Sequence, residues 1–513
     1  MALLYLKGMN KTDYDLCVIG GGVNGAGIAR DAAGRGLSVL LLEAKDLACA
    51  TSSASTKLIH GGLRYLEFFE FRLVRDSLKE RERLMGIAPH LIYPMDFVLP
   101  HAPEQRPFWM IRLGLFLYDH LTRRARLKGS RGVNLWASAL GVPLDDRYAK
   151  GFCYADCWAD DSRLVVLNAV DAAEKGAEIL TRTQCTKIIP HRDHWSIEFK
   201  AQGKKKSEVV TASMVVNAAG PWVRKVLEDS GLESPVKPVP KVRLVKGSHI
   251  IIPRAYDGEQ AYILQQKDQR IVFVIPYEGK YTLVGTTEES FEGDLYDPRI
   301  SDEEMQYLCD AYSTHFKDDV TPDDVIWTYS GVRPLFDDGE EDSRTVTRDF
   351  VLHEHLESRA PMISIFGGKL TTYRILAEQV VQRLLHLDHR YTNPWTGTKT
   401  LPGGDIPDGD FNRFLDVQAQ VYAWLPEDLL LRYARNYGTR MDRFLEGATS
   451  VKDLGEHYGD DVYEAEIVYL VRYEWAREAE DILWRRSKLG VHVSDDTVAA
   501  LEKALPKLKK EVL

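Results

Sequence analysis

The sequence predicts an α/β protein with three parts: a parallel-sheet domain at the N-terminal end, a mostly antiparallel sheet in the middle, and a helical domain at the C-terminal end. A strand, a glycine-rich loop, a helix and a second strand follow one another over residues 14–43. β-Forming runs separated by turns fill the middle of the chain, and helical runs without glycine-rich loops follow residue 402. The chain has 513 residues, of which 44% are hydrophobic, so it can bury two or three cores.

The first unit, residues 14–43, reads YDLCVIGGGVNGAGIARDAAGRGLSVLLLE. A short apolar strand leads into Gly20, Gly22 and Gly25, which form a G-x-G-x-x-G motif. Such glycines permit a tight turn, let the backbone approach a pyrophosphate, and let the following helix pack closely on the strand. The helix points its first amides at that anion. The second strand ends in Glu43, where an acidic side chain bonds the ribose hydroxyls. The whole unit predicts a Rossmann-type dinucleotide-binding domain.

Composition excludes several classes of protein. The formal net charge of −10 argues against a general nucleic-acid binder. The six cysteines are sparse, with no C-x-x-C pair and no zinc-ligand spacing, which indicates a reducing compartment and predicts no metal site. The first ten residues are too short for a signal peptide, and no apolar run approaches the roughly 18 residues needed to span a bilayer.

The segment that follows Glu43 favours FAD over a shorter dinucleotide. LACATSSASTKLIHGGLRYLE, residues 47–67, is dense in serine, threonine and glycine, whose hydroxyls and amides suit a second stretch of pyrophosphate and a ring edge. The alternative is a serine-rich surface loop. Cys49 lies where flavin disulfide reductases carry a redox cysteine pair, but no second cysteine follows closely, so we expect Cys49 to be structural.

The middle of the chain contains KGSHIIIP, RIVFVIPYEGKYTLVGTTE and WTYSGVRPL, which predict a mostly antiparallel substrate sheet. Before them, VVNAAGPW brings bare backbone at Gly220 to the dinucleotide. After them, MISIFGGKLTTYR returns to the strand, glycine and helix pattern of the first domain. The expected division is an FAD-binding domain over 10–90, 151–240 and 346–395, a substrate- or membrane-facing segment over 91–150, a substrate domain over 241–345, and a C-terminal helical domain over 396–513.

These motifs carry a family resemblance. Through IHGGLRYLE, YSGVRPL and FGGKLTTYR, and into the C-terminal DLGEHYG and LWRR, nearly the whole chain resembles the FAD-dependent, quinone-linked (aerobic) glycerol-3-phosphate dehydrogenases. The resemblance implies that sn-glycerol 3-phosphate is oxidised to dihydroxyacetone phosphate. It also implies that electrons pass from reduced FAD to membrane quinone, on a cytoplasmic protein associated with the inner face of the cell membrane. A homodimer is left open.

Two alternatives remain at this point. One is an oxygen-using oxidase of glycerophosphate or of an amine, from the same wider group of flavoproteins; the glycerophosphate oxidases usually carry an insertion that this chain lacks. The other is a non-catalytic, flavin-binding membrane sensor. The arginines and histidines gathered in the resembling motifs argue against a sensor.

Alcohol oxidation by a flavin needs a base for the hydroxyl proton and cations for the developing alkoxide and the phosphate. We expect His60 to be the base, with His249 second, because imidazole titrates near neutral pH; either could instead be a hydrogen-bonded structural histidine. Arg333, at an expected strand end, would polarise the oxygen or grip the phosphate, its alternative being an ion pair with the neighbouring acidic loop. Lys369, at an expected helix start, would neutralise charge on reduced flavin or phosphate.

The resemblance implies further contacts. Those with the substrate phosphate are Arg64, Tyr65, Arg348 and Arg333. Those with the ADP half of FAD are Gly20, Gly22, Gly25 and Glu43. Those near its ring are Ser53, Thr56, Gly220, Gly367, Gly368, Lys369, Leu370 and Thr371.

A basic, apolar segment over residues 106–129 predicts a contact with the membrane. Read as one helix, Trp109, Leu113, Phe116 and Leu117 recur on one face, and arginines surround or follow them. Tryptophan, leucines and flanking arginines suit a helix that lies in an anionic lipid surface. The alternative is a helix packed into the protein with a basic solvent face.

Overall fold

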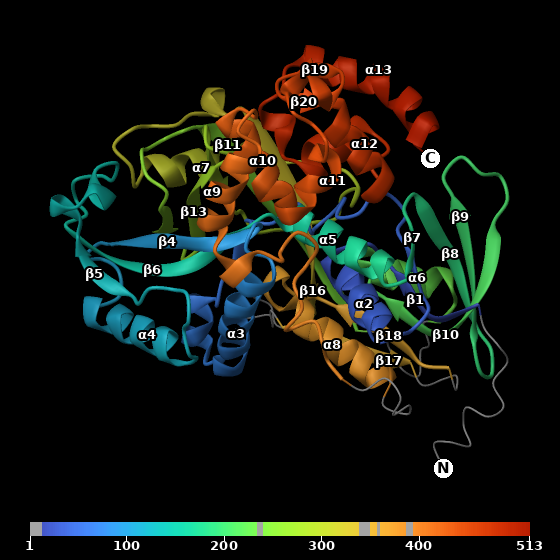
Figure 1. The fold of residues 1–513 in the computed structure, drawn as a ribbon. Coiled ribbons are helices and arrows are strands. Elements are labelled where there is room, and N and C mark those ends of the chain that lie inside the picture. The colour runs from blue at the N-terminus through green and yellow to red at the C-terminus, as the bar shows by residue number, and fades with distance from the viewer. Residues whose placement is uncertain (1–12, 233–239, 338–348, 356–359, 386–392, 513) are drawn as a thin grey trace.

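The computed structural model describes residues 13–232, 240–337, 349–355, 360–385 and 393–512. Two large sheets lie beside each other, and the C-terminal helices pack over their junction (Figure 1). This arrangement confirms the expected fold class: a Rossmann-type parallel sheet, a mostly antiparallel sheet and a C-terminal helical domain.

The first sheet has eight strands, of which five consecutive ones, from β18 to β7, run parallel. Its main path, in spatial order, is β17 (Val351–His355), β18 (Met362–Phe366), β10 (Glu208–Asn217), β1 (Tyr14–Ile19), β2 (Val39–Leu42) and β7 (Glu178–Leu180). An antiparallel hairpin extends it from β10, made of β8 (Thr183–Pro190) and β9 (Trp195–Ala201).

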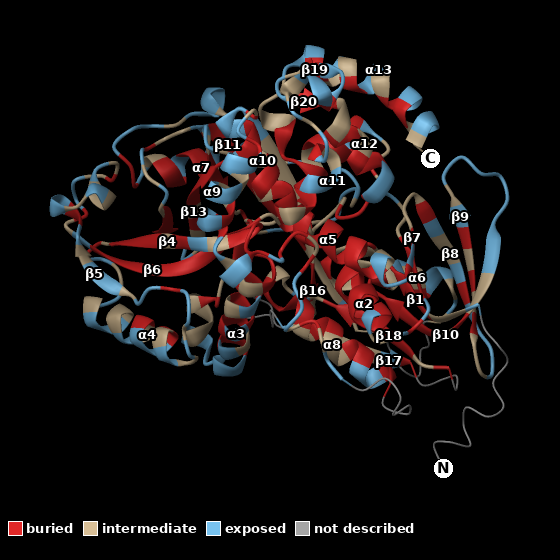
Figure 2. Cartoon of the chain, in the orientation of Figure 1, coloured by how far each residue is buried: buried red, intermediate tan, exposed pale blue. Residues whose placement is uncertain are grey.

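Both faces of this parallel sheet are covered by other elements, and side chains alternate between the two faces along each strand. On β1, Leu16 and Val18 pack against helices on one face, whereas Cys17 and Ile19 pack on the other face against α6 and the hairpin. Figure 2 shows how deeply the central strands and α2 are buried. The covering helices are α2 (Val23–Gly34), α5 (Asp161–Glu174), α8 (Tyr373–Leu384) and α6 (Val223–Asp229).

The second sheet has ten strands, all antiparallel except for the pairing of β12 with β4. Its main path is β15 (Glu289–Ser290), β11 (Val242–Pro253), β14 (Tyr281–Gly285), β13 (Ile271–Tyr277), β12 (Ala261–Gln265), β4 (Ile92–His101), β6 (Lys150–Ala159) and β3 (Leu58–Ile59). Branching from it are β16 (Trp327–Phe336), which pairs with β11, and β5 (Arg131–Asn134), which pairs with β6.

The structure shifts two expected assignments. Residues 58–59, within the expected FAD-binding range 10–90, form β3, which pairs with β6 in the second sheet. Residues 151–159 were expected in the FAD-binding domain, but they belong to β6, which pairs with β4 over ten residue pairs in the second sheet. One face of this sheet packs on α7 (Asp302–Ser313), and the other on α3 (Phe71–Ile87) and α4 (Phe108–His120).

The expected helix over 106–129 is shorter than predicted. α4 ends at His120, and the basic residues beyond it fold back as a loop. Asp119 holds this turn, because its carboxylate accepts a hydrogen bond from the Ser130 amide at 2.8 Å and one from Arg124 Nη1 at 2.9 Å. These non-local bonds compete with continuation of the helix.

The apolar stripe of α4 faces outward rather than into the core. Its buried residues are Leu115 and Tyr118, whereas Trp109 is 65% exposed, Leu113 50% and Phe116 49%. Large exposed apolar patches mark interaction surfaces. In the described part of the chain, no helix is both long and apolar enough to span a membrane.

The C-terminal helices enclose a hydrophobic core of their own. The elements are α9 (Phe411–Val421), α10 (Glu427–Tyr437), α11 (Asp442–Leu445), α12 (Glu464–Tyr473), α13 (Asp495–Val512) and the small pair β19 (His457–Gly459) and β20 (Val462–Tyr463). In Figure 1 they lie at the top, whereas α4 lies at the lower left.

Candidate active site

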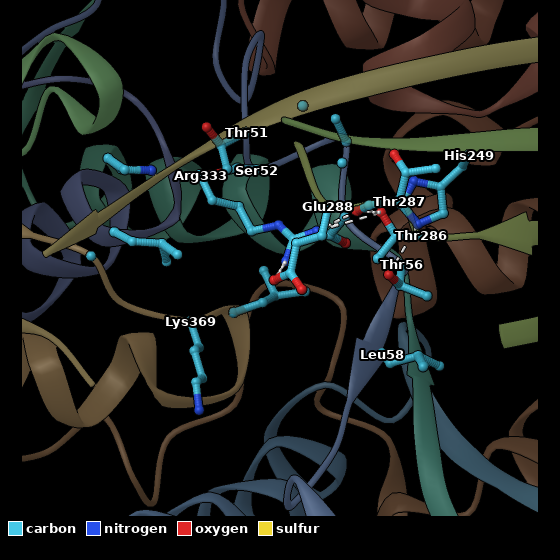
Figure 3. A pocket seen from close by; sticks show the side chains of 18 of the residues that line it. Thr51, Ser52, Thr56, Leu58, His249, Thr286, Thr287, Glu288, Arg333 and Lys369 are labelled. Atoms are coloured by element: carbon cyan, nitrogen blue, oxygen red, sulfur yellow. Dashed lines mark hydrogen bonds and ion pairs between the residues drawn. The ribbon is translucent and has the colours of Figure 1, made fainter. Parts of the chain in front are cut away.

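A cavity of about 1950 Å³ runs between the two sheets. Its walls come from the start of α2, the loop after β2, strands β11 and β16, and the segment before α8; Figure 3 shows part of it. The sequence-predicted residues that line it are Gly20, Gly22, Glu43, Thr56, His60, Arg64, Tyr65, Gly220, His249, Arg333, Gly367, Gly368, Lys369, Leu370 and Thr371. Arg348 lies outside the described residues.

The glycine motif forms a turn that side chains would fill. Gly20 has φ +109°, and a Cβ there would lie 2.5 Å from the Ala218 carbonyl oxygen. A Cβ on Gly25 would lie 1.9 Å from the Gly20 carbonyl oxygen, so Gly25 does not line the cavity but lets α2 pack against the turn. At Gly22, a Cβ would stand 3.1 Å from Ser52 Oγ. Bare backbone therefore faces the cavity at the beginning of α2.

Glu43 is held at the end of β2 by backbone amides. Its Oε2 accepts a hydrogen bond from Gly21 N and its Oε1 one from Lys45 N, each at 2.7 Å. Burial raises the pKa of Glu43 despite these bonds. Gly367 and Gly368, both with positive φ, complete the opposite side. Open glycine backbone, a helix N-terminus, a fixed acid and the cavity volume fit a dinucleotide as large as FAD.

The structure corrects the expectation for Ser53. Its hydroxyl donates to the Ala50 carbonyl oxygen at 3.3 Å, and its side chain does not line the cavity. The neighbouring Ser52 does, and its Oγ accepts a hydrogen bond from Val23 N at 3.0 Å. The serine-rich segment therefore holds the start of α2 through Ser52, a role that the sequence did not predict.

His249 lies on β11 with its ring against Gly285, where a Cβ would stand 2.2 Å from His249 Cδ2. Its Nε2 is 3.0 Å from Thr56 Oγ1, and its buried Nδ1 has no hydrogen-bond partner among the described residues. Burial lowers the pKa of His249 well below its usual value, and the charges of Lys57 and Arg333 lower it further. The ring is therefore neutral at pH 7 and can accept a proton.

Arg333 projects from the middle of β16 rather than from a strand end as expected. Its Nη2 lies 3.4 Å from Thr286 Oγ1 and 3.3 Å from the Thr287 carbonyl oxygen, and Nη1 lies 3.4 Å from Glu288 Oε1. A Cβ on Gly247 would reach within 2.3 Å of Nη2, so that glycine makes room for the guanidinium. The fork of Arg333 is thus held in the cavity wall (Figure 3).

His60 and Lys369 come from another part of the wall. Lys369 Nζ stands 3.8 Å from the centre of the Tyr65 ring, and the His60 amide donates to Thr371 Oγ1 at 3.3 Å. Burial lowers the pKa of His60, and Lys369 adds to this, whereas the charge of Asp156 opposes it. Lys369 directly precedes a short helical turn and α8, as the sequence predicted.

Sequence reasoning missed several lining residues, which are Asn24, Ser52, Gly247, Thr286, Thr287 and Glu288. The only signal for the last three was a Gly-Thr-Thr-Glu run at the end of a β-forming segment. All six cysteines are free, and no group of three or more histidine, cysteine or carboxylate side chains among the described residues could hold a metal ion.

Comparison with known proteins identifies the family of the chain. Residues 15–374 match the FAD dependent oxidoreductase family model, and residues 395–512 match the C-terminal domain of alpha-glycerophosphate oxidase. The chain is 50% identical to an aerobic glycerol-3-phosphate dehydrogenase of Escherichia coli, over 94% of this chain and 95% of that protein. It is 48% identical to a D-erythritol 1-phosphate dehydrogenase of Brucella abortus, over 95% of this chain and 96% of that protein.

A solved structure is also similar over the full length. It is a glycerol-3-phosphate dehydrogenase from Bacillus halodurans complexed with FAD, with a TM-score of 0.75 and 27% identity, covering 99% of this chain and 95% of that one. The chain therefore belongs to the FAD-dependent oxidoreductases, in the family of the aerobic glycerol-3-phosphate dehydrogenases.

Proposed function

We propose that this enzyme oxidises sn-glycerol 3-phosphate to dihydroxyacetone phosphate and passes the electrons to a quinone in the membrane. One observation carries the proposal: a single cavity joins the FAD cradle to His249, His60, Arg333 and Lys369. The relatives named as glycerol-3-phosphate dehydrogenases, at 47–50% identity, support this choice of substrate.

The reaction removes the hydroxyl proton from the middle carbon of the substrate and a hydride from the same carbon. FAD, when bound, accepts that hydride. His249 and Arg333 contact consecutive residues, Gly285 and Thr286, so both side chains can reach one three-carbon substrate. Neutral His249 takes the hydroxyl proton, while the Arg333 guanidinium stabilises the negative charge that develops on the oxygen. The sequence favoured His60 as the base, with His249 second. We propose the reverse order because His249 lies beside Thr286, which contacts Arg333, so His60 becomes the second candidate.

The substrate phosphate needs cations at the other end of the molecule. We assign this role to Lys369 and Arg64, with Tyr65 beside them, because all three line the cavity on the wall that also carries His60. Arg348 remains a candidate from the sequence alone. A phosphate held there places the middle carbon between the two walls.

The test is a spectrum of the yellow holoenzyme without oxygen. Glycerol 3-phosphate should bleach the flavin absorption within a single turnover, whereas glycerol, which lacks the phosphate, should leave it unchanged at the same concentration. If no phosphorylated polyol bleached the flavin, the proposed dehydrogenase activity would be refuted.

D-Erythritol 1-phosphate is a second candidate substrate, because a relative named for that activity is 48% identical over 95% of this chain. It carries one more carbon and hydroxyl than glycerol 3-phosphate, and the cavity is lined by further polar residues that include Gln265 and Arg270. The ratio of kcat/KM for the two phosphates decides between them.

The electron acceptor requires a second assay. With a quinone as acceptor, turnover should release little hydrogen peroxide under air, whereas an oxygen-using oxidase would produce one peroxide for each substrate oxidised. Measurement of peroxide during turnover therefore separates the two functions. Light scattering of the purified holoenzyme measures its oligomeric state.

The exposed face of α4 suits docking on a membrane surface. Trp109, Leu113 and Phe116 are turned to solvent, and Arg123 and Arg126 beyond the helix are exposed as well. An apolar face flanked by arginines binds the interface of anionic lipids without spanning them. This would place the enzyme where a lipid-soluble quinone is available.

Co-sedimentation with liposomes tests this contact. Binding to anionic vesicles should weaken with salt and fall when Arg123, Arg126 and Lys128 are changed to glutamine; Arg124 is omitted because it is paired with Asp119. Dye-linked activity should remain while quinone-linked activity falls. The matched control changes the three exposed lysines at 204–206 to glutamine. Equal loss of binding in both variants would refute a specific role for the α4 region.

A further inference from the structure

Residues 481–492 form one of the segments through which the C-terminal domain contacts the catalytic part of the chain. Trp484 stacks on Trp327, the first residue of β16, with ring centres 4.4 Å apart and planes within 17°. The Tyr281 hydroxyl of β14 donates to the Val491 carbonyl oxygen at 2.7 Å. The segment therefore touches the strand that carries Arg333 and the strand that pairs with His249.

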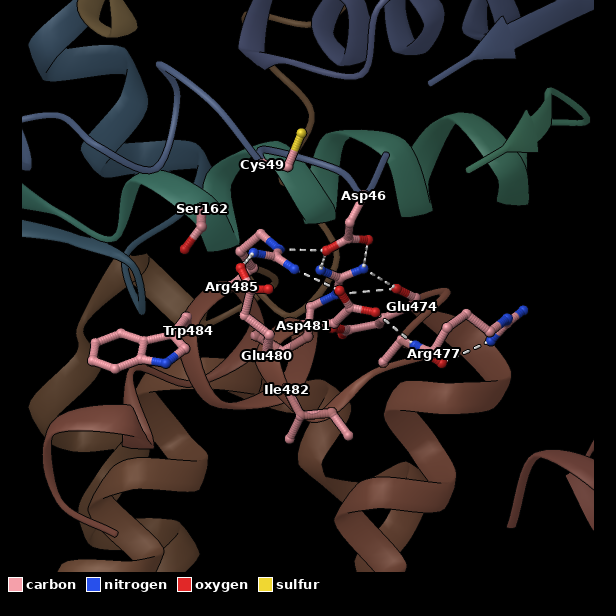
Figure 4. Close-up of polar contacts among 12 residues, drawn as sticks. Asp46, Cys49, Ser162, Glu474, Arg477, Glu480, Asp481, Ile482, Trp484 and Arg485 are labelled. Atoms are coloured by element: carbon pink, nitrogen blue, oxygen red, sulfur yellow. Dashed lines mark hydrogen bonds and ion pairs between the residues drawn. The ribbon is translucent and has the colours of Figure 1, made fainter. Parts of the chain in front are cut away.

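The same segment holds the loop that follows Glu43. Arg485 Nε lies 2.6 Å from Asp46 Oδ2, and Arg486 bonds both oxygens of Asp46 at 2.6 and 2.8 Å (Figure 4). Burial alone would raise the pKa of Asp46. The two guanidinium charges outweigh this effect, so the pKa of Asp46 is lowered. This cluster fixes the C-terminal segment against the FAD-binding domain.

Lys488, in the same segment, contacts buried residues at the start of α5. Its Nζ lies 3.2 Å from Asp161 Oδ1 and 3.4 Å from Asp160 Oδ1, at the start of α5. The other oxygen of Asp161 bonds Lys57 Nζ at 2.9 Å. Lys488 is 4% exposed, Asp161 0% and Lys57 2%. Burial alone would raise the pKa of Asp161, but the two ammonium groups lower it.

From Lys57 the contacts continue to the active site. Its Nζ stands 4.8 Å from the centre of the Tyr329 ring and donates to the Ser53 carbonyl oxygen at 2.9 Å. Tyr329 stacks on the His249 ring at 4.7 Å, with planes within 17°, and its hydroxyl donates to the Ser55 carbonyl oxygen at 2.8 Å. A continuous series of contacts between buried and half-buried side chains thus joins Lys488 to His249.

We propose that Lys488 of the C-terminal domain is a positioning residue for the oxidation. It holds Asp161, which holds Lys57; Lys57 and Tyr329 together fix the ring of His249 and the loop that carries its Thr56 contact. The inference rests on the proposed role of His249. A purely apolar contact would stabilise the domain interface at least as well as these buried charges. The charges therefore point to a need to hold these side chains in a defined arrangement.

The experiment compares flavin-loaded Lys488→Met with Lys509→Met. Lys509 lies in the same domain, and its Nζ bonds only a carbonyl of that domain, at Arg477. Lys488→Met should keep its flavin and reduce it roughly tenfold more slowly with substrate, because misplacement far from the chemistry can cost up to about 100-fold. The substrate dissociation constant should change less than twofold. Lys488→Arg should restore most of the rate, and Lys509→Met should match the parent enzyme.

A second measurement is independent of activity. Hydrogen exchange of the holoenzyme without substrate should rise in peptides covering 53–58 and 327–333 in Lys488→Met, but not in Lys509→Met. If Lys488→Met folds poorly, Tyr329→Phe tests the other end, since it keeps the stacked ring and loses only the bond to Ser55; it should also slow flavin reduction several-fold. A parent-like rate in either variant, or a lower melting temperature without a slower rate, would overturn the proposal. A different outcome is that no tested substrate reduces the flavin of the parent enzyme, while hydrogen exchange in Lys488→Met still rises as expected. The proposed function would then fail, and the positioning contact would stand.

Discussion

The sharpest structural prediction concerns Gly25, whose missing side chain lets α2 approach the turn after β1. A Cβ at this position would lie 1.9 Å from the Gly20 carbonyl oxygen, whereas real Cβ atoms stay at least 3.0 Å away, so helix and turn must separate by about 1.1 Å in Gly25→Ala. Overpacking of this kind costs about 1–3 kcal/mol. The clash falls on the backbone of the cradle, not on the pyrophosphate directly.

Because the displaced amides are those that face the pyrophosphate, we expect most of this cost to appear as weaker FAD binding, by roughly 5- to 150-fold. The assay is titration of apoprotein with FAD, followed by flavin fluorescence and by melting temperature. Gly86→Ala is the matched control, since Gly86 also lies in a helix and a Cβ there would come no closer than 3.9 Å to another atom. Equal FAD affinity in the two variants would refute the reasoning.

Three further predictions concern the reaction, and a fourth concerns stability. Arg333→Lys keeps the charge but loses the fork, so flavin reduction should slow by roughly 10- to 150-fold, the equivalent of about 1.5–3 kcal/mol, while the flavin stays bound; stopped-flow absorbance measures this. His249→Ala should slow the same step by about 100-fold or more, as loss of a general base does, and His60→Ala less; the opposite order would move the base to His60. Because the pKa of His249 is lowered, its ring stays neutral between pH 6.5 and 8. Titration of His249 should therefore not change the rate of flavin reduction in this range. The rate should fall only at lower pH, where the ring becomes protonated. Stability should fall below about pH 6.5, since the unfolded ring then binds a proton that the folded ring does not.

The parts of the fold that the sequence predicted are those built from neighbouring residues. β1, α2 and β2 follow one another within 30 residues, and their glycines and apolar runs directly reflect that geometry. Strand pairing over long distances was not predictable in the same way. Residues 151–159 were included in the FAD-binding range 151–240, but they form β6, whose partner β4 lies about 60 residues earlier in the chain and belongs to the second sheet.

In the candidate site, too, residues in local motifs were predictable and residues brought together by strand pairing were not. His249 and Arg333 lie in distinctive motifs and were found, but the residues that hold Arg333, Thr286 to Glu288, meet it only through the pairing of β11 with its neighbours. The length of α4 was overestimated because its end depends on the bonds of Asp119 to Ser130 and Arg124 and not on a glycine or proline. The basic contacts of the C-terminal domain carry no recognisable spacing at all.

The order of strands in the first sheet has a consequence for how this protein is made. β1 pairs with β10, about 200 residues later, and β10 pairs with β18, almost 150 residues after that. On the ribosome the nascent chain must therefore release nearly three quarters of its length before the parallel sheet can close, and such non-local pairing is slow. The cavity is complete only after this closure, because Gly367 and Gly368 line it. Cellular supply of flavin should consequently determine how much of the newly synthesised chain escapes degradation, since a ligand that binds only the folded state stabilises it by mass action.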